Sequence, residues 1–128
     1  MIPDHLRYTA EHEWIWLTEA GLARFGITDH AQDALGDIVF VTLPEVGTRI
    51  EVGQPCGEVE STKSVADVFA PVTGVVTAVN DSVITAPETI NADPYGAGWL
   101  AEVELDSANG GNSGLMTATE YEALVANI

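Results

Sequence analysis

Lys63 carries the only lysine ammonium in this chain of 128 residues, whose other basic side chains are three arginines. The segments on either side of it, Gly57–Glu60 and Val65–Phe69, alternate apolar and polar residues as half-buried strands do. Between them, Ser61–Ser64 has the short polar composition of a hairpin turn. The pattern predicts a primary amine at an exposed turn tip, where an enzyme can reach it. Taken alone, this hairpin favours the simpler interpretation of a solvated loop lysine, and the rest of the chain decides between the two.

The residues around Lys63 argue against a catalytic amine. The carboxylates of Glu58, Glu60 and Asp67 favour the ammonium form, and exposure at a turn removes the desolvation that a Schiff-base lysine needs. These surroundings suit an amine that another enzyme recognises and acylates, after which the charge is lost.

Other residues with chemical potential give no active site. His5, His12 and His30 lack metal-ligand spacing, so no metal site is expected. Cys56 has no basic neighbour that would activate its thiol, and it is expected to be a small buried hydrophobe. Nucleophile-elbow, phosphate-loop and dinucleotide motifs are missing from the sequence. We therefore expect no catalytic residues.

The bulk composition predicts one folded domain over residues 1–128, with 46% apolar residues. A net charge of −16 and a pI near 4.1 argue against binding to nucleic acid or to anionic membranes. They favour partners with basic docking surfaces. A single cysteine cannot form an intramolecular disulfide, and residues 1–5 resemble neither a signal peptide nor a transit peptide. We expect a cytoplasmic protein.

Short strands separated by Gly and Pro turns predict a mainly β fold, a small barrel or flattened sandwich. A short internal helix is expected to begin at Thr28–Asp29 and to stop at Gly36. A C-terminal helix at about 117–126 has a capping-box start and apolar residues at helical spacing. The expected strands are 8–17, 22–27, 37–43, 57–60, 65–69, 75–80 and 99–105, and the expected turns or loops are 19–21, 87–94 and 107–114.

The lysine hairpin, followed by Ala70-Pro71-x-x-Gly74, resembles the biotinyl and lipoyl carrier domains. Biotin carriers typically place methionines on both sides of the lysine. Thr62 and Ser64 occupy those places here, which favours lipoate.

The rest of the chain resembles the H-protein family of the glycine cleavage system. The similar segments follow the same order over nearly the whole chain, and Thr62 stands where valine is commoner. They are Tyr8 with Glu11–Trp14, Gly26–Gln32, Leu35–Val41, Leu43–Gly47, the lipoylation motif Glu60-Ser61-Thr62-Lys63, Asn91-x-x-Pro94-Tyr95-Gly96-x-Gly98-Trp99-Leu100, and Glu120-Tyr121.

The resemblance implies a barrel-sandwich hybrid fold and a lipoyl group on Lys63, within a motif of Glu60, Ser61, Thr62 and Ser64. It implies a monomeric, non-catalytic shuttle that takes an aminomethyl group from the pyridoxal-phosphate-dependent glycine decarboxylase (P protein). The group passes to the tetrahydrofolate-dependent aminomethyltransferase (T protein), and dihydrolipoamide dehydrogenase (L protein) reoxidises the arm. Lipoylating enzymes are further partners.

The resemblance also implies a cleft that shelters the loaded arm, with Glu13 and Asp67 as candidates to hold its amine. Neighbouring carboxylates bind an amine by charge-assisted hydrogen bonds. From the residues alone, Glu58 and Glu60 are equally good candidates. Glu13 and Asp67 are also compatible with solvated surface carboxylates.

Two alternatives to a glycine-cleavage carrier follow from the same sequence. One is a related protein that mainly relays lipoyl groups to 2-oxoacid dehydrogenase subunits. The other is an unmodified scaffold that has kept the fold.

Overall fold

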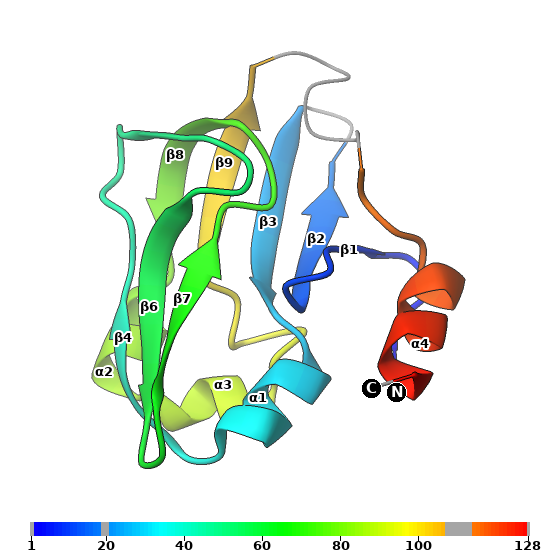
Figure 1. Cartoon of the computed structure of the whole chain (residues 1–128). Coiled ribbons are helices and arrows are strands. Elements are labelled where there is room, and N and C mark those ends of the chain that lie inside the picture. Colours follow the sequence, from blue (N-terminus) through cyan, green and yellow to red (C-terminus); the bar gives the residue numbers. More distant parts are fainter. Residues whose placement is uncertain (1, 19–20, 107–113, 128) are drawn as a thin grey trace.

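The computed structural model describes residues 2–18, 21–106 and 114–127, which contain nine strands and four helices (Figure 1). The strands are β1 (Arg7–Tyr8), β2 (Glu13–Leu17), β3 (Leu22–Ile27), β4 (Ile38–Thr42), β5 (Arg49–Ile50), β6 (Pro55–Ser61), β7 (Val65–Phe69), β8 (Gly74–Val79) and β9 (Ala101–Leu105). The helices are α1 (Asp29–Leu35), α2 (Asp81–Thr85), α3 (Glu88–Ala92) and α4 (Ala118–Ala126). The loops expected at 19–21 and 107–114 lie almost wholly outside the described residues. None of the described helices has the length and apolar character that a membrane crossing requires.

The strands form two antiparallel sheets. The larger has the order β1-β2-β3-β9-β8-β5, and the smaller has the order β4-β6-β7. The main core draws buried side chains from both sheets, such as Phe25 and Val103 from the larger and Val59 and Val68 from the smaller. These observations confirm the mainly β, flattened-sandwich fold, and neither sheet closes into a barrel within the described part of the chain.

The β6–β7 hairpin follows from the alternation in its sequence. Val59 and Val68 point into the core, whereas Glu58, Glu60 and Asp67 are exposed. Because a slip of one residue would expose both valines, their burial fixes the register of the pair. The hairpin extends along one side of the molecule to a narrow tip near α1 (Figure 1).

The prediction of one strand over residues 8–17 is wrong. The chain turns back after Tyr8, and β1 pairs with β2. In this turn the Thr9 N–H donates to the Glu13 carbonyl at 3.0 Å, and His12 adopts a left-handed φ of 69°. A positive φ is uncommon for residues other than glycine, although histidine adopts it more readily than most, and the apolar pattern of the flanking residues gives no sign of it. The turn makes Glu13 the first residue of β2.

The prediction of only two helices, with a loop at 87–94, is also wrong. Asn80 caps α2 by accepting a hydrogen bond from the Ser82 N–H, and Pro87 precedes α3. Each of these helices has five residues and one fully buried apolar side chain, Val83 in α2 and Ile90 in α3. Helices this short are not stable alone, so their existence depends on packing that local sequence does not display.

The C-terminal helix α4 begins with the expected capping box. Thr117 and Glu120 exchange side-chain hydrogen bonds with each other's backbone N–H groups. Tyr121 is fully buried and stacks on Tyr8 with ring centroids 4.8 Å apart. Together with Trp14, these residues form a second core under α4, separate from the core between the sheets.

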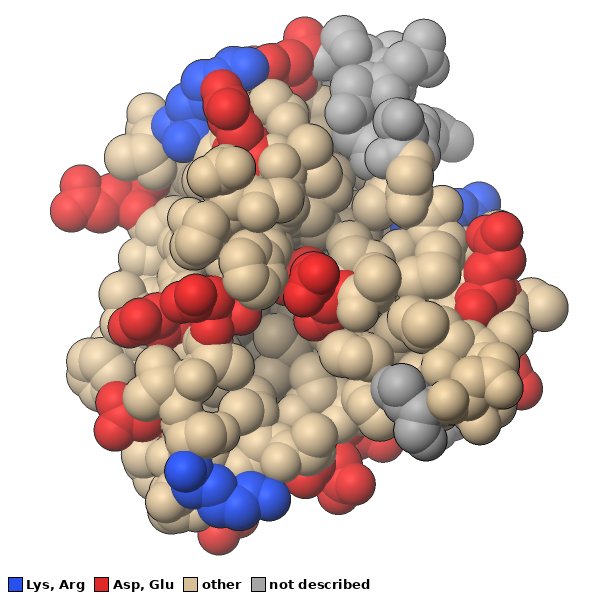
Figure 2. Space-filling model, in the orientation of Figure 1, with Lys and Arg blue, Asp and Glu red and all other residues tan. Residues whose placement is uncertain are grey.

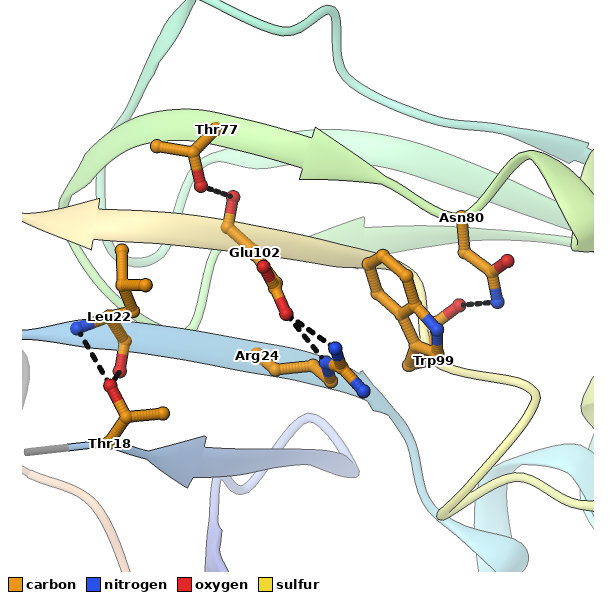
Figure 3. A network of polar contacts seen from close by, with 7 residues as sticks. All are labelled: Thr18, Leu22, Arg24, Thr77, Asn80, Trp99 and Glu102. Atoms are coloured by element: carbon orange, nitrogen blue, oxygen red, sulfur yellow. Dashed lines mark hydrogen bonds and ion pairs between the residues drawn. The ribbon is translucent and has the colours of Figure 1, made fainter. Parts of the chain in front are cut away.

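An ion pair on the larger sheet lies beside the Trp99 side chain (Figure 3). Arg24 of β3 donates two hydrogen bonds to Glu102 of β9 at 2.8 and 2.6 Å, and its guanidinium lies 4.4 Å from the centroid of Trp99. The Asn80 amide donates to the Trp99 carbonyl at 2.7 Å. These contacts join β3, β9 and the start of α2.

Candidate functional site

Ser61 shapes the turn that presents Lys63. Its buried hydroxyl accepts hydrogen bonds from the N–H groups of Lys63 and Ser64, both at 3.1 Å, and its own N–H donates to the Ser64 carbonyl at 2.8 Å. One hydroxyl therefore satisfies two turn amides, as Ser does in many tight turns. Thr62, Lys63 and Ser64 are exposed, as expected for a turn tip.

The turn is attached to the body of the protein beside the end of α1. The Thr62 N–H donates to the Asp37 carbonyl at 3.1 Å. The Lys63 side chain lies over Gly36, and a Cβ on this glycine would come 3.2 Å from Lys63 Cε. Gly36 has a φ of 84° and its N–H caps α1 by donating to the Gln32 carbonyl. Glycine at this position permits the positive φ that ends α1, and its missing Cβ leaves room for the Lys63 side chain.

Asn91 of α3 holds the segment 36–38, which follows α1, by side-chain hydrogen bonds. Its Oδ1 accepts from the Ile38 N–H at 3.0 Å, and its Nδ2 donates to the Gly36 carbonyl at 2.9 Å and to Gln32 Oε1 at 2.8 Å. The segment 36–38 in turn holds Thr62. Asn91 is a positioning residue that the sequence interpretation missed, although it opens the Asn91-x-x-Pro94 segment of the family resemblance.

Glu13 lies in a cleft of about 220 Å³ between the start of β2 and the end of β7. Its side chain is 2% exposed, and it accepts hydrogen bonds from the Thr9 hydroxyl at 2.8 Å and from the Phe69 N–H at 3.0 Å. Thr9, Glu11, Gly53 and Phe69 are among the lining residues. Figure 2 shows acidic side chains near the middle of the face that it draws, beside a hollow in that face.

Burial raises the pKa of the Glu13 carboxyl from its ordinary 4.5 to about 7, although the hydrogen bonds from Thr9 and Phe69 act in the opposite direction. A carboxylate with two donors and no cation beside it is incompletely compensated for its lost hydration. A cationic group that entered the cleft would stabilise the ionised form. Glu13 is thus equipped to bind an amine.

Asp67 lies on β7, two residues before Phe69, and is exposed opposite Glu58 of β6. The structure therefore places Asp67 and the Glu13 contact in succession along β7, the strand that follows the Lys63 turn. Phe69 follows Val65, the first residue of β7, by four residues, which is about 13 Å at the strand rise of about 3.3 Å per residue. Asp67 does not line the cleft, and neither do Glu58 and Glu60, which are exposed on β6.

The remaining candidates behave as structural groups. Burial, followed by the Glu13 charge, raises the pKa of the half-buried Cys56 thiol to about 12, so it is not a nucleophile at neutral pH. His12 and His30 lie together, with ring centroids 4.6 Å apart, although they are distant in sequence. The His12 Nδ1 contacts the Tyr121 hydroxyl at 2.7 Å. Among the described residues, no three His, Cys, Asp or Glu side chains are arranged to hold a metal ion.

Comparison with known proteins gives a consistent result. The family model described as "Glycine cleavage H-protein" matches residues 6–128. The glycine cleavage system H proteins of Beutenbergia cavernae and Mycobacterium avium are both 52% identical to the chain, over 98% and 95% of its length and 97% and 92% of their own. The crystal structure of a glycine cleavage system H protein from Mycobacterium marinum superposes with a TM-score of 0.90 at 47% identity, covering 98% of this chain and 99% of that one.

Proposed function

The chain belongs to the glycine cleavage H-protein family, and on this premise we propose that Lys63 is the residue to which its lipoyl group is attached. Its function is that of the lipoyl carrier in glycine cleavage, and the names of its relatives favour this role over lipoyl relay to 2-oxoacid dehydrogenases. The observation that carries the proposal is the position of Lys63, the only lysine, at the exposed tip of a turn shaped by Ser61.

The residues present fit a covalently attached acyl group. Lys63 is exposed, none of the ion pairs among the described residues involves it, and its side chain lies over a glycine. A lipoylating enzyme that uses lipoyl adenylate, made from lipoate and ATP, would form the amide between Nζ and the acyl carbon. The acyl–phosphate bond breaks, AMP leaves, and the ammonium gives up two protons.

When bound, the lipoyl group supplies the dithiol and disulfide chemistry that carries the aminomethyl group of glycine. The chain has one cysteine and cannot supply that chemistry itself. We assign no catalytic residue to the chain, whose part is to present, orient and shelter.

Glu13 and Asp67 are proposed to hold the positive charge of the carried amine. A flexible group attached to Lys63 that lies back along β7 would meet Asp67 first and the Glu13 cleft after it. In the cleft, the ionised Glu13 carboxylate would accept a charge-assisted hydrogen bond from the amine, and Asp67 would add charge from the exposed side. The walls of the cleft limit the access of water to this end of the strand.

The proposed partners are the P, T and L proteins and the lipoylating enzymes. The net charge of −16 favours partners with basic docking surfaces and steers their encounter over distances of about 8 Å at physiological salt. A monomeric state is part of the same proposal. So is a place in the bacterial cytoplasm, because the relatives named above are bacterial proteins.

Intact mass spectrometry tests the attachment. The chain expressed with lipoate and a lipoylating enzyme is expected to gain one lipoyl group, and Lys63→Arg is expected to remain unmodified with an unchanged thermal melt. An unmodified wild-type chain under these conditions, or a modified Lys63→Arg variant, would reject Lys63 as the site. Glycine-dependent NADH formation with purified P, T and L proteins then tests the partners.

The role of the two carboxylates needs a separate test. We expect Glu13→Gln together with Asp67→Asn to accelerate the loss of the aminomethyl group from the loaded carrier by about tenfold or more, which corresponds to one lost charge-assisted hydrogen bond of about 1.5–3 kcal/mol. Glu58→Gln is the matched control, since Glu58 is exposed opposite Asp67 and lies outside the cleft. An unchanged lifetime in the double variant would remove both residues from this role.

A further inference from the structure

Large apolar side chains are exposed close to the Lys63 turn. Val39 and Phe40 of β4 are 50% and 57% exposed, and Val65 of β7 is 57% exposed. Val65 follows Lys63 by two residues. Single exposed apolar residues are common on proteins, but three beside one modifiable residue form a patch.

The register of the smaller sheet aligns two of these residues. Phe40 is the cross-strand partner of Glu60, and Glu60 is the partner of Val65. The Phe40–Glu60–Val65 row lies on the outer face of the sheet, since the next residues inward, Val41 and Val59, are buried in the core. Neighbouring side chains in such a row are about 5 Å apart. The row therefore presents two apolar side chains on either side of one carboxylate.

The surroundings of the row are acidic. Two residues further from the turn, the next row of side chains on the same outer face consists of Thr42, Glu58 and Asp67, all of which are exposed. Figure 2 shows acidic side chains spread over the face that it draws, with few basic ones among them. A partner protein that is complementary to this surface has an apolar pocket surrounded by basic residues.

The core of the protein makes no use of the Phe40–Glu60–Val65 row. Phe40 and Val65 do not belong to either buried cluster or to the side chains packed against them. Aromatic residues at the centre of an interface commonly contribute much of its affinity. These two apolar side chains are thus available to a partner.

We propose that the Phe40–Glu60–Val65 row is the docking surface for the enzyme that acylates Lys63, an inference that rests on the proposed attachment of lipoate to this residue. The acylating enzyme must bring its active site to the Nζ of an unmodified lysine. Glu60 and Val65 lie three and two residues from Lys63, so an enzyme that encloses the amine covers the row. Partners that act on the far end of the attached group have no such requirement.

Steady-state acylation kinetics test the proposal. The substrates are lipoate, ATP and the unmodified chain, and the enzyme is a purified lipoate–protein ligase. We expect Phe40→Thr and Val65→Thr each to raise the KM for the chain about tenfold with little change in kcat. Threonine retains strand propensity in both, and thermal melting by circular dichroism checks that each variant is folded.

Val46→Thr and Val75→Thr are the matched controls. Val46 and Val75 are 58% and 38% exposed, Val75 lies on β8 of the other sheet, and neither is in the row. Their KM values are expected to equal that of the wild-type chain. Row variants whose KM matches that of the controls, or a KM raised equally by the controls, would overturn the docking surface.

Fully lipoylated row variants separate this role from docking of the glycine-cleavage enzymes. After exhaustive acylation they are expected to support glycine-dependent NADH formation at the wild-type KM. A raised KM in that assay with normal acylation kinetics would assign the row to another partner and overturn the proposal. A wild-type chain that the ligase cannot modify would overturn the attachment at Lys63 itself, whereas normal wild-type acylation with unaffected row variants overturns only the docking surface.

Discussion

Glu13→Gln is expected to stabilise the protein at alkaline pH and to have little effect at acidic pH. The glutamine carbonyl can accept the Phe69 N–H as the carboxylate does, and its amide can donate to the Thr9 hydroxyl oxygen. The substitution therefore keeps the shape and the two contacts of the buried side chain. It removes only the ability to ionise.

The size of the effect follows from the raised pKa of Glu13. The folded state binds a proton at this carboxyl up to about pH 7, whereas the unfolded state releases it near the ordinary 4.5. Between these values the folded state holds more protons, so the free energy of unfolding of the wild type falls as pH rises. The full loss is about 3 kcal/mol above pH 7, and about 2.5 kcal/mol of it develops between pH 5 and pH 8.

Urea denaturation of both proteins at pH 5 and pH 8 measures this loss. With a urea dependence of about 1–3 kcal/mol per M, the gap between the two midpoints is expected to widen by about 1 M or more at pH 8. Glu11→Gln is the control, because Glu11 lines the same cleft but is exposed. A gap of equal size at both pH values would refute the account of Glu13 as an uncompensated buried carboxylate.

Three further substitutions test contacts of the site and its support. Asn91→Ala removes three hydrogen bonds and is expected to lower the free energy of unfolding by about 2–4 kcal/mol in urea denaturation and to slow acylation, while unchanged values would remove Asn91 as a positioning residue. Gly36→Ala places a left-handed φ on alanine and a Cβ against the Lys63 side chain. We therefore expect the free energy of unfolding to fall by about 1 kcal/mol and the KM for acylation to rise, and a variant with both values unchanged would contradict this. Tyr121→Phe deletes the hydroxyl that contacts His12 and Thr28, and we expect it to lower the free energy of unfolding by about 1–3 kcal/mol. Thermal denaturation at pH 8 measures this change, and a loss below about 0.5 kcal/mol would show that these contacts contribute little.

The Lys63 turn could be predicted from the sequence because all its determinants are local. The alternation in β6 and β7 fixes the strands, and Ser61 satisfies amides only two and three residues ahead of it. The helix starts at Thr28 and Thr117 were predictable for the same reason, since each cap acts on an amide three residues away.

The cleft could not be predicted in this way because its contacts join distant segments. Glu13 receives the Phe69 N–H from 56 positions away, and without that contact nothing distinguishes it from Glu58 or Glu60. Asn91 bonds to groups 53 to 59 positions away. The family resemblance named Glu13 and Asp67, but the burial that gives Glu13 its unusual acidity is a property of the folded chain.

The packing of β7 connects the two halves of the site. Val68 faces the core, so the strand can slip by one residue only by exposing it, and such a slip would also move the Phe69 N–H away from Glu13. The burial of Val68 therefore fixes the register of β7, which sets the distance from the Lys63 turn to the cleft and holds the Phe69 N–H where it donates to the Glu13 carboxylate. An ionised Glu13 lowers stability at neutral pH, and glutamine would keep its contacts without that loss. A buried carboxylate that weakens the fold when ionised, at the end of the strand that follows Lys63, is the arrangement expected of a site for a cation. Functional groups are commonly retained at the expense of stability.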